Sequence, residues 1–193
     1  LLGSVMARAA LDGTGRDDLL GRIAAGDVAT VVMQNPVLYG AQASLLLAVD
    51  GDGIVLVDPA SAVIEPLPAL DPTLRFADVT VDGSESISPD GADRVRTALL
   101  VGVCALAAGT ARRGLDMTVA YSKERVQFGR QIGSFQALKH RMADMLVLVE
   151  MTRSASWAAA AGELDPATAA AYCVDALQKV AAETIQLHGG IAI

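Results

Sequence analysis

The feature that most constrains this chain is the length of the helical patterns that follow residue 87. Three such patterns cover residues 88–122, 134–161 and 165–190. Each is longer than the roughly 10–14 residues of an average globular helix. Because helices of this length need neighbours along their whole extent, the pattern favours a long antiparallel bundle or the core of an oligomer.

Start and stop signals support these ranges. Ser88–Pro89 and Asp165–Pro166 each place a capping side chain before a proline at the first helical position, and Ser134 offers a third N-cap. Gly189–Gly190 ends the last helix. Apolar residues at helical spacing predict the buried faces, which are Val95, Leu99, Val103 and Leu106, then Phe135, Leu138, Met142, Leu146 and Val149, and finally Cys173, Leu177, Val180, Thr184 and Leu187.

Residues 29–87 have a β pattern instead. Short apolar runs at 30–33, 45–49, 54–57 and 74–81 predict strands, and five prolines interrupt the segment. Asp50-Gly-Asp-Gly53 predicts a hairpin because Asp and Gly tolerate positive φ. Residues 1–28 are typical of the end of a helical region. The sequence therefore predicts an α+β chain with three parts, residues 1–28, a partial β domain at 29–87 and a helical bundle domain at 88–193.

Composition and charge exclude several functions. The net charge of −7 argues against nucleic-acid binding, which depends on Lys and Arg neutralising phosphates. The longest apolar run, residues 98–111, is shorter than the roughly 20 residues of a membrane span, so no membrane contact is expected. Cys104 and Cys173 lie within apolar helical runs and are interpreted as core residues in a reducing cytoplasm. No His/Cys spacing predicts a metal site.

Two motifs carry more chemistry than a helical bundle needs. The turn between the first two helices reads Arg125-Val-Gln-Phe-Gly-Arg-Gln-Ile-Gly-Ser-Phe-Gln136. A reversal needs glycine but has no need of Arg125, Gln127, Phe128 and Gln136 together. Arginine is well shaped to bind phosphate, phenylalanine offers a flat face, and glutamine both donates and accepts. From the residues alone, a structural turn remains the stronger interpretation and a ligand site the alternative.

The second motif is Gln186-Leu-His-Gly-Gly190, at the end of the third helix. Two glycines after a helix are usually a C-cap, and His188 is more often a capping histidine than a catalytic one. The cations between Arg112 and Arg153 could face the phosphates of a nucleotide cofactor, although a solvated helix face is the stronger interpretation for any single one of them.

Taken as a set, these motifs and the Tyr121-x-x-x-Arg125 and Ala143-Asp-Met145 patterns resemble the C-terminal four-helix domain of the acyl-CoA dehydrogenase family. The resemblance is good over residues 88–193 and weak over residues 19–83. It implies FAD as cofactor, with Arg125 at the pyrophosphate of a neighbouring subunit's FAD. It places Gln127, Phe128 and Gln136 on the adenosine side. The remaining residues that it places along the FAD are Gln186, Leu187, Gly189 and Gly190.

The family reaction removes an α-proton and a β-hydride from an acyl-CoA thioester, so it needs a proton acceptor. At one position where the family carries its glutamate, this chain has Leu99, or Val95 if the alignment shifts by one helical turn. We therefore assign no catalytic residue to this chain, and expect the base in sequence beyond Ile193 or on a partner. Met33-Gln-Asn-Pro-Val37 also departs from the Thr-Glu-Pro-like flavin strand of the family.

Four hypotheses follow. The first is a cytoplasmic acyl-CoA dehydrogenase subunit that desaturates a fatty or steroid side-chain acyl-CoA, in a heterotetramer or homotetramer, and passes electrons to an electron-transfer flavoprotein. The second is a non-catalytic partner subunit of a heteromeric acyl-CoA dehydrogenase. The third is an acyl-CoA oxidase or flavin monooxygenase on the same scaffold. The fourth is a helical scaffold without cofactor.

Overall fold

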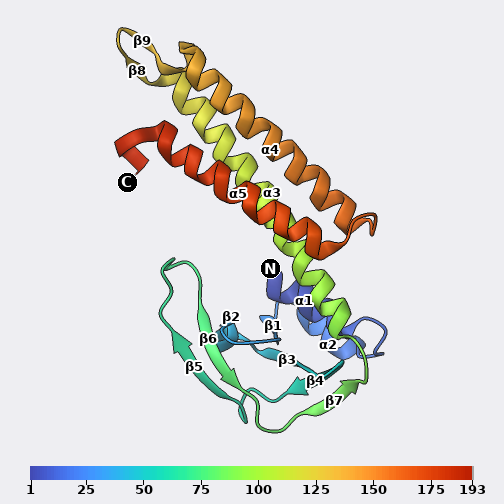
Figure 1. The fold of residues 1–193 in the computed structure, drawn as a ribbon. Helices are drawn as coiled ribbons and strands as arrows, with labels where there is room; N and C mark the ends of the chain where they lie inside the picture. Colours follow the sequence, from blue (N-terminus) through green and yellow to red (C-terminus); the bar gives the residue numbers. More distant parts are fainter. Residues whose placement is uncertain (193) are drawn as a thin grey trace. The chain divides into compact units, whose positions relative to one another are not determined.

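The structure is a computed structural model that describes residues 1–192 (Figure 1). The chain divides into two compact units, residues 1–99 and residues 100–193, and each is described by itself. The mixture of helices and strands with a C-terminal helical domain confirms the predicted α+β class.

The first unit contains two helices and two small sheets. Its helices are α1 (Leu2–Leu11) and α2 (Asp17–Ala24). The four-stranded sheet has the order β1-β3-β4-β7, in which β1 pairs parallel with β3 and the other pairs are antiparallel. The three-stranded sheet has the antiparallel order β2-β6-β5. The strands are β1 (Ala29–Val32), β2 (Val37–Leu38), β3 (Leu45–Asp50), β4 (Gly53–Val57), β5 (Val63–Leu67), β6 (Phe76–Thr80) and β7 (Glu85–Ser88).

The strand β3 is buried on both faces, which explains its run of three leucines. Leu45 and Leu47 pack with residues of α1 and α2, whereas Leu46 packs with the second sheet through Ala77 and Val79. The predicted hairpin is confirmed, since Asp50 pairs with Gly53 and Gly51 has φ +58°.

Strand predictions for the first unit were incomplete. The strands β2, β5 and β7 were not predicted, and β6 begins at Phe76, where a strand from residue 74 was expected. Helix α3 (Ala92–Glu124) begins at Ala92, so the predicted start at Ser88–Pro89 was wrong. The reason is that Ser88 is used by β7, where it pairs with Ile54. The amide of Ala92 donates to the Asp52 carbonyl at 3.1 Å, which fixes the later start.

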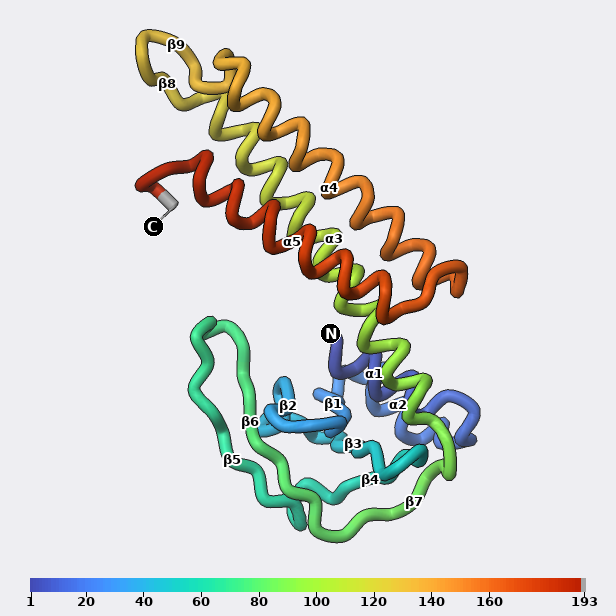
Figure 2. The backbone as a smooth tube through the Cα atoms, in the orientation of Figure 1, coloured from blue at the N-terminus to red at the C-terminus, as the bar shows by residue number. Residues whose placement is uncertain are grey.

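The second unit contains most of α3 together with α4 (Gln136–Ala160) and α5 (Pro166–His188). Figure 2 shows the backbone passing from α3 through a short hairpin into α4. The helix α5 begins as predicted, because the Asp165 carboxylate accepts hydrogen bonds from the amide and hydroxyl of Thr168, each at 2.8 Å. Arg141 on α4 and Glu183 on α5 form an ion pair at 2.6 Å.

Small side chains fill most of the bundle core. One cluster centres on Cys104, Ala107, Ala159, Ala169 and Cys173, and a second on Ala111, Leu115, Met145, Val149 and Val180. The predicted face of α5 is confirmed at Cys173 and Val180. The predictions of Leu106 and Leu146 as core residues were wrong, because both are about half exposed (52% and 45%) while their neighbours Ala107 and Met145 are buried.

The buried cysteines confirm the interpretation as core residues. Both thiols are free, and the Cys173 Sγ lies 3.7 Å from the Thr152 carbonyl. Burial and the neighbouring Cys104 raise the pKa of Cys173 to about 12, so its thiol stays protonated. Within residues 1–192, α3 is the one helix long and apolar enough to span a bilayer by length and composition, a test that the core helix of a soluble protein also passes.

Candidate functional site

The turn predicted as a ligand site is a two-stranded hairpin with an unfavourable residue at its tip. The strands β8 (Val126–Gln127) and β9 (Arg130–Gln131) are joined by Phe128 and Gly129, whose φ angles are +54° and +76°. Two consecutive positive φ values define a turn that normally takes Asn-Gly or Gly-Gly. A phenylalanine there is strained, and its side chain is 91% exposed. Backbone strain of this kind is concentrated at functional sites, which makes Phe128 a candidate contact residue.

Contacts around the hairpin hold it against the helices. The amide of Ile132 donates to the Arg125 carbonyl at 2.8 Å, which extends the pairing of the two strands. The ring of Phe128 stands edge-on to Phe135, with centroids 6.1 Å apart. A Cβ at Gly133 would lie 2.8 Å from the Ser122 carbonyl, so glycine is required where the chain passes the end of α3.

The cations at this end of the bundle have no ion pairs. Lys123, Arg125, Arg130 and Lys139 are all exposed, and within the described chain none of them forms a salt bridge. Between residues 123 and 139, Glu124 is the only acidic residue. The local excess of positive charge contrasts with the net charge of −7 of the chain, and makes this surface able to bind an anion.

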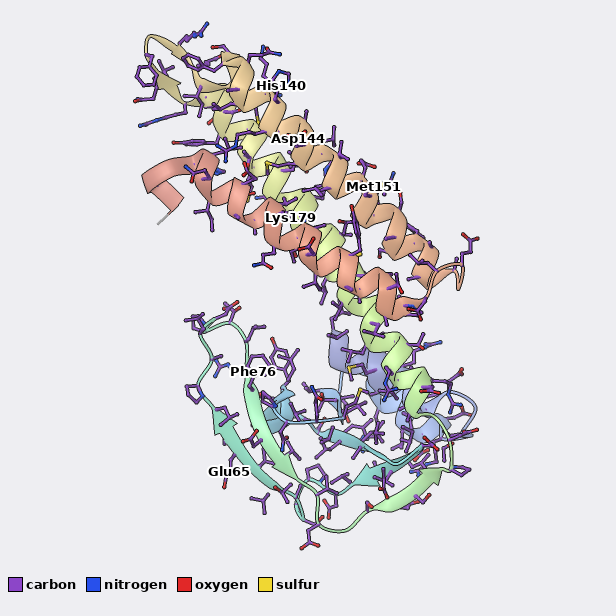
Figure 3. All side chains as sticks on the ribbon, in the orientation of Figure 1. Glu65, Phe76, His140, Asp144, Met151 and Lys179 are labelled. Atoms are coloured by element: carbon purple, nitrogen blue, oxygen red, sulfur yellow. The ribbon has the colours of Figure 1, made fainter. Side chains whose placement is uncertain are left out.

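Gln136 is the first residue of α4, and its side chain is exposed. Its Nε2 lies 3.3 Å from Nε2 of His140, one turn further along the helix, where Figure 3 labels His140. The prediction of Ser134 as N-cap was wrong, because Ser134 lies in a 3₁₀ turn and its hydroxyl donates to the Gln131 carbonyl at 2.6 Å. The contact with His140 orients the Gln136 amide, and His140 was not selected from the sequence.

The second motif lies at the C-terminal end of α5. Gln186, Gly189 and Gly190 are exposed and Leu187 packs partly against the bundle core. Gly189 caps the helix with φ +65° and ψ −149°, a conformation that is essentially restricted to glycine and differs from the left-handed helical one of the usual C-cap. Added Cβ atoms at Gly189 and Gly190 would meet nothing within 4 Å. The helix is followed by a 3₁₀ turn, Gly189–Ala192.

His188 connects the two motifs. Its ring stacks on Tyr121 of α3 with centroids 4.6 Å apart, and its Nδ1 lies 2.7 Å from the Thr184 carbonyl. The contact of Nδ1 with a carbonyl of the last helical turn is what a capping histidine makes. Because Tyr121 precedes Arg125 by one turn, the stack brings the start of the hairpin and the end of α5 to the same end of the bundle.

The two positions considered for a catalytic base both hold apolar side chains that pack into the core of the first unit. Val95 is fully buried in the core of the first unit, and Leu99 packs partly against the same cluster. Residues 33–37, which differ from the flavin strand of the family, make structural contacts in this chain. The Asn35 side chain donates to the Val79 carbonyl at 3.2 Å and accepts from the Val79 amide at 2.9 Å, so it is engaged by β6.

The described cavities lie away from the predicted residues. A cavity of about 440 Å³ in the first unit is lined by Arg22, Leu45, Asp58 and Gly83 among others, and one of about 270 Å³ in the bundle by Val101, Ala105 and Trp157 among others. Neither includes a predicted cofactor contact. The hairpin, by contrast, combines a strained aromatic residue with cations that form no ion pair within the described chain. No metal-binding cluster occurs among residues 1–192.

Comparison with known proteins agrees with these features. Residues 91–193 match the family described as "Acyl-CoA dehydrogenase, C-terminal domain", and the chain belongs to this family. Acyl-CoA dehydrogenase IpdE2 of Mycolicibacterium smegmatis is 41% identical over 197 residues, which cover 100% of this chain and 62% of that protein. The chain therefore spans less than two thirds of the length of this curated relative.

Solved structures show the same fold. A variant of the Tcur3481-Tcur3483 steroid ACAD superposes with a TM-score of 0.84 at 24% identity, covering 97% of this chain and 64% of that chain. The ChsE4-ChsE5 complex from Mycobacterium tuberculosis superposes with a TM-score of 0.64 at 25% identity, covering 86% of this chain and 53% of that chain.

Proposed function

We propose that this chain acts in an FAD-dependent acyl-CoA dehydrogenase, and that its hairpin and the end of α5 hold FAD at a boundary with a second subunit. The observation that carries the proposal is Phe128, a strained and exposed aromatic residue at the hairpin tip. A turn selected only for stability would have Asn or Gly there. Presenting a ring to a ligand or to a neighbouring chain explains both its conformation and its exposure.

The residues present fit a flavin dinucleotide. Arg125 would bind the pyrophosphate, because it is exposed and has no acidic partner in the described chain. Gln127, Phe128 and Gln136 would contact the adenosine side. Gln186 and Leu187 would line the cofactor, and Gly189 and Gly190 leave space for it to approach the backbone.

The proposed reaction is desaturation of an acyl-CoA thioester between its α- and β-carbons. FAD, when bound, would accept the hydride that leaves the β-carbon. The α-proton needs a separate acceptor, and neither Val95 nor Leu99 can take it. Within this proposal, the chain supplies cofactor binding, and the base comes from another part of the protein or from the partner.

Because this chain would bind cofactor without supplying the base, a second candidate function is a non-catalytic partner subunit. The specific observation is Asn35, whose side chain is hydrogen-bonded to β6 where the family has a flavin-contacting strand. Such a chain would complete the FAD site of a homologous subunit in a heterotetramer. A homotetramer of the longer protein is the alternative within the first candidate.

The outer surface of the bundle supports an oligomer. Large apolar side chains remain exposed on α3, α4 and α5, namely Leu106, Val147, Met151, Trp157, Val174 and Ile185 (Figure 3 labels Met151). Helices that are apolar on both faces are normally covered by further protein. Two structural neighbours, a steroid ACAD and the ChsE4-ChsE5 complex, support a steroid side-chain thioester as substrate and a homologous subunit as partner. We place the enzyme in the cytoplasm and propose an electron-transfer flavoprotein as the acceptor of its electrons.

The test is flavin retention by the full-length protein, purified alone and together with any acyl-CoA dehydrogenase subunit encoded beside its gene. We expect Arg125→Ala to lower flavin absorbance per protein at least ten-fold. Arg113→Ala is the matched control, since Arg113 is also exposed and forms no described ion pair. Equal flavin content in both variants and the wild type would refute the proposed role of the hairpin.

The same preparations separate the remaining alternatives. Flavin bound by the protein alone indicates a self-sufficient dehydrogenase, whereas flavin only in the co-purified complex indicates the shared site of a partner subunit. Rapid reoxidation of the reduced flavin by oxygen would instead identify an oxidase or monooxygenase. Absence of flavin from every preparation would leave a helical scaffold.

A further inference from the structure

The hairpin carries a cation that neither the motif nor the family resemblance assigns. In its register, Gln127 pairs with Arg130 and Val126 with Gln131, while the Arg125 carbonyl accepts from Ile132. Residues directly opposite across a strand pair lie on the same face, and alternate residues along a strand share a face. Arg125, Gln127 and Arg130 therefore lie on one face of the hairpin, although Arg130 is five residues from Arg125 in the sequence.

Arg130 is held in place by an aromatic ring. Its guanidinium carbon lies 4.0 Å from the centroid of Phe135, which in turn contacts the edge of Phe128. A cation over a ring face is attracted by the π electrons and loses some of its freedom before any ligand binds. Like Arg125, Arg130 is exposed and has no salt bridge within the described chain. Its five N–H donors remain available for an anion.

We propose that Arg130 is a second anion-binding residue, which Phe135 pre-orients to bind the FAD pyrophosphate together with Arg125. A pyrophosphate carries two negative charges and several acceptor oxygens, so two guanidinium groups on one face match it better than one. The inference rests on the proposed function, because it names a further contact in the same cofactor site. It assigns Phe135 a positioning role through Arg130.

The experiment measures the dissociation constant of FAD for the apoprotein, in complex with the subunit that completes its site. Binding is followed by flavin fluorescence at two ionic strengths. We expect Arg130→Gln to weaken FAD binding about ten-fold and to reduce its salt dependence. Arg130→Lys should keep the salt dependence but recover only part of the affinity, because lysine lacks the planar fork. Phe135→Leu should weaken binding about three-fold while the charge stays the same.

Arg113→Gln is the matched control, because it removes the same charge from an exposed arginine without a described ion pair, three turns before the end of α3. Riboflavin, which lacks phosphate, should bind wild type and Arg130→Gln equally. If Arg130→Gln behaves like Arg113→Gln while Arg125→Ala loses FAD, the inference is wrong and the proposed function stands. If the wild-type complex binds no FAD, both fail.

Discussion

The first unit (residues 1–99, called the β unit below) and the helical bundle (residues 100–193) bury their apolar residues in different ways. In the β unit, the largest fully buried side chains include Leu11, Leu45, Leu46, Leu47 and Ile54. In the bundle, the core consists mainly of alanine, cysteine and valine, with Met145 as its largest fully buried side chain. Several larger apolar residues of the bundle face outward instead. The first unit places these large side chains in its own core, whereas the bundle core is built from smaller ones and leaves Leu106, Trp157 and Ile185 exposed.

The largest expected effect is a cavity in the β unit. Leu47→Ala should lower the free energy of unfolding by about 3 kcal/mol, because Leu47 is fully buried where β3 packs against α1 and α2. Leu106→Ala removes the same atoms from a side chain that is 52% exposed, and should change the stability of the isolated chain by no more than about 0.5 kcal/mol. Urea unfolding followed by circular dichroism measures both. Equal losses of unfolding free energy in the two variants would show that large apolar side chains contribute equally to the stability of both units.

The second prediction concerns the outer face of the bundle. Trp157 is 70% exposed, and as the only tryptophan it is the strongest candidate for an interface anchor. Trp157→Ala should weaken subunit association by about 2 kcal/mol and leave the melting of the isolated chain nearly unchanged. Sedimentation velocity at several concentrations measures the association. Val63→Ala is the control, since Val63 is 56% exposed on β5 of the other unit. A similar effect of both substitutions would contradict an interface specific to the bundle.

Sequence patterns predicted long segments better than boundaries and short strands. The three long helices and the hairpin at Asp50–Gly53 follow from periodicity and turn chemistry over many residues. Ser88 has the sequence of an N-cap, but pairing with β4 determines its conformation, and a single-segment pattern does not contain that partner. The β5 strand contains Pro66 and is largely exposed, so neither propensity nor alternation marks it. Long-range pairing decides such short strands.

The sequence motifs select the candidate site, but they do not select all of the residues that the structure brings near it. The motifs identify the hairpin and the end of α5, because glycines and functional side chains are close in sequence there. Leu106 and Leu146 were misassigned because the largest apolar residues were expected inside, while close packing of the helices selects Ala107 and Met145. Arg130 and His140 were missed because their relation to Arg125 and Gln136 depends on strand register and on the true start of α4.

The third prediction separates stability from binding within the hairpin. Phe128→Gly should raise the stability of the flavin-free bundle by up to about 1 kcal/mol, because glycine adopts φ +54° without steric cost. The same substitution should lower flavin retention, since the exposed ring is lost. Val126→Gly is the control, because Val126 lies in the same hairpin without a positive φ and should only be destabilised. A Phe128→Gly variant that is less stable than wild type would mean that the ring is retained for packing on Phe135.

The smallest expected effect is at the start of α5. Hydrogen bonds from the backbone and the hydroxyl of Thr168 hold the pKa of Asp165 below the usual value of an aspartate. Because the folded-state pKa is depressed, the carboxylate stabilises the bundle above the unfolded value, and this contribution is lost as pH falls through the folded pKa. Asp165→Ser keeps a capping oxygen that does not titrate, so its melting temperature should depend less on pH below about 4 than that of the wild type. Asp165→Ala should lose stability at neutral pH as well. If the melting temperatures of wild type and Asp165→Ser change with pH in parallel, the charge of Asp165 does not contribute and the cap acts through its oxygen alone. The acid sensitivity of the bundle would then come from other carboxylates.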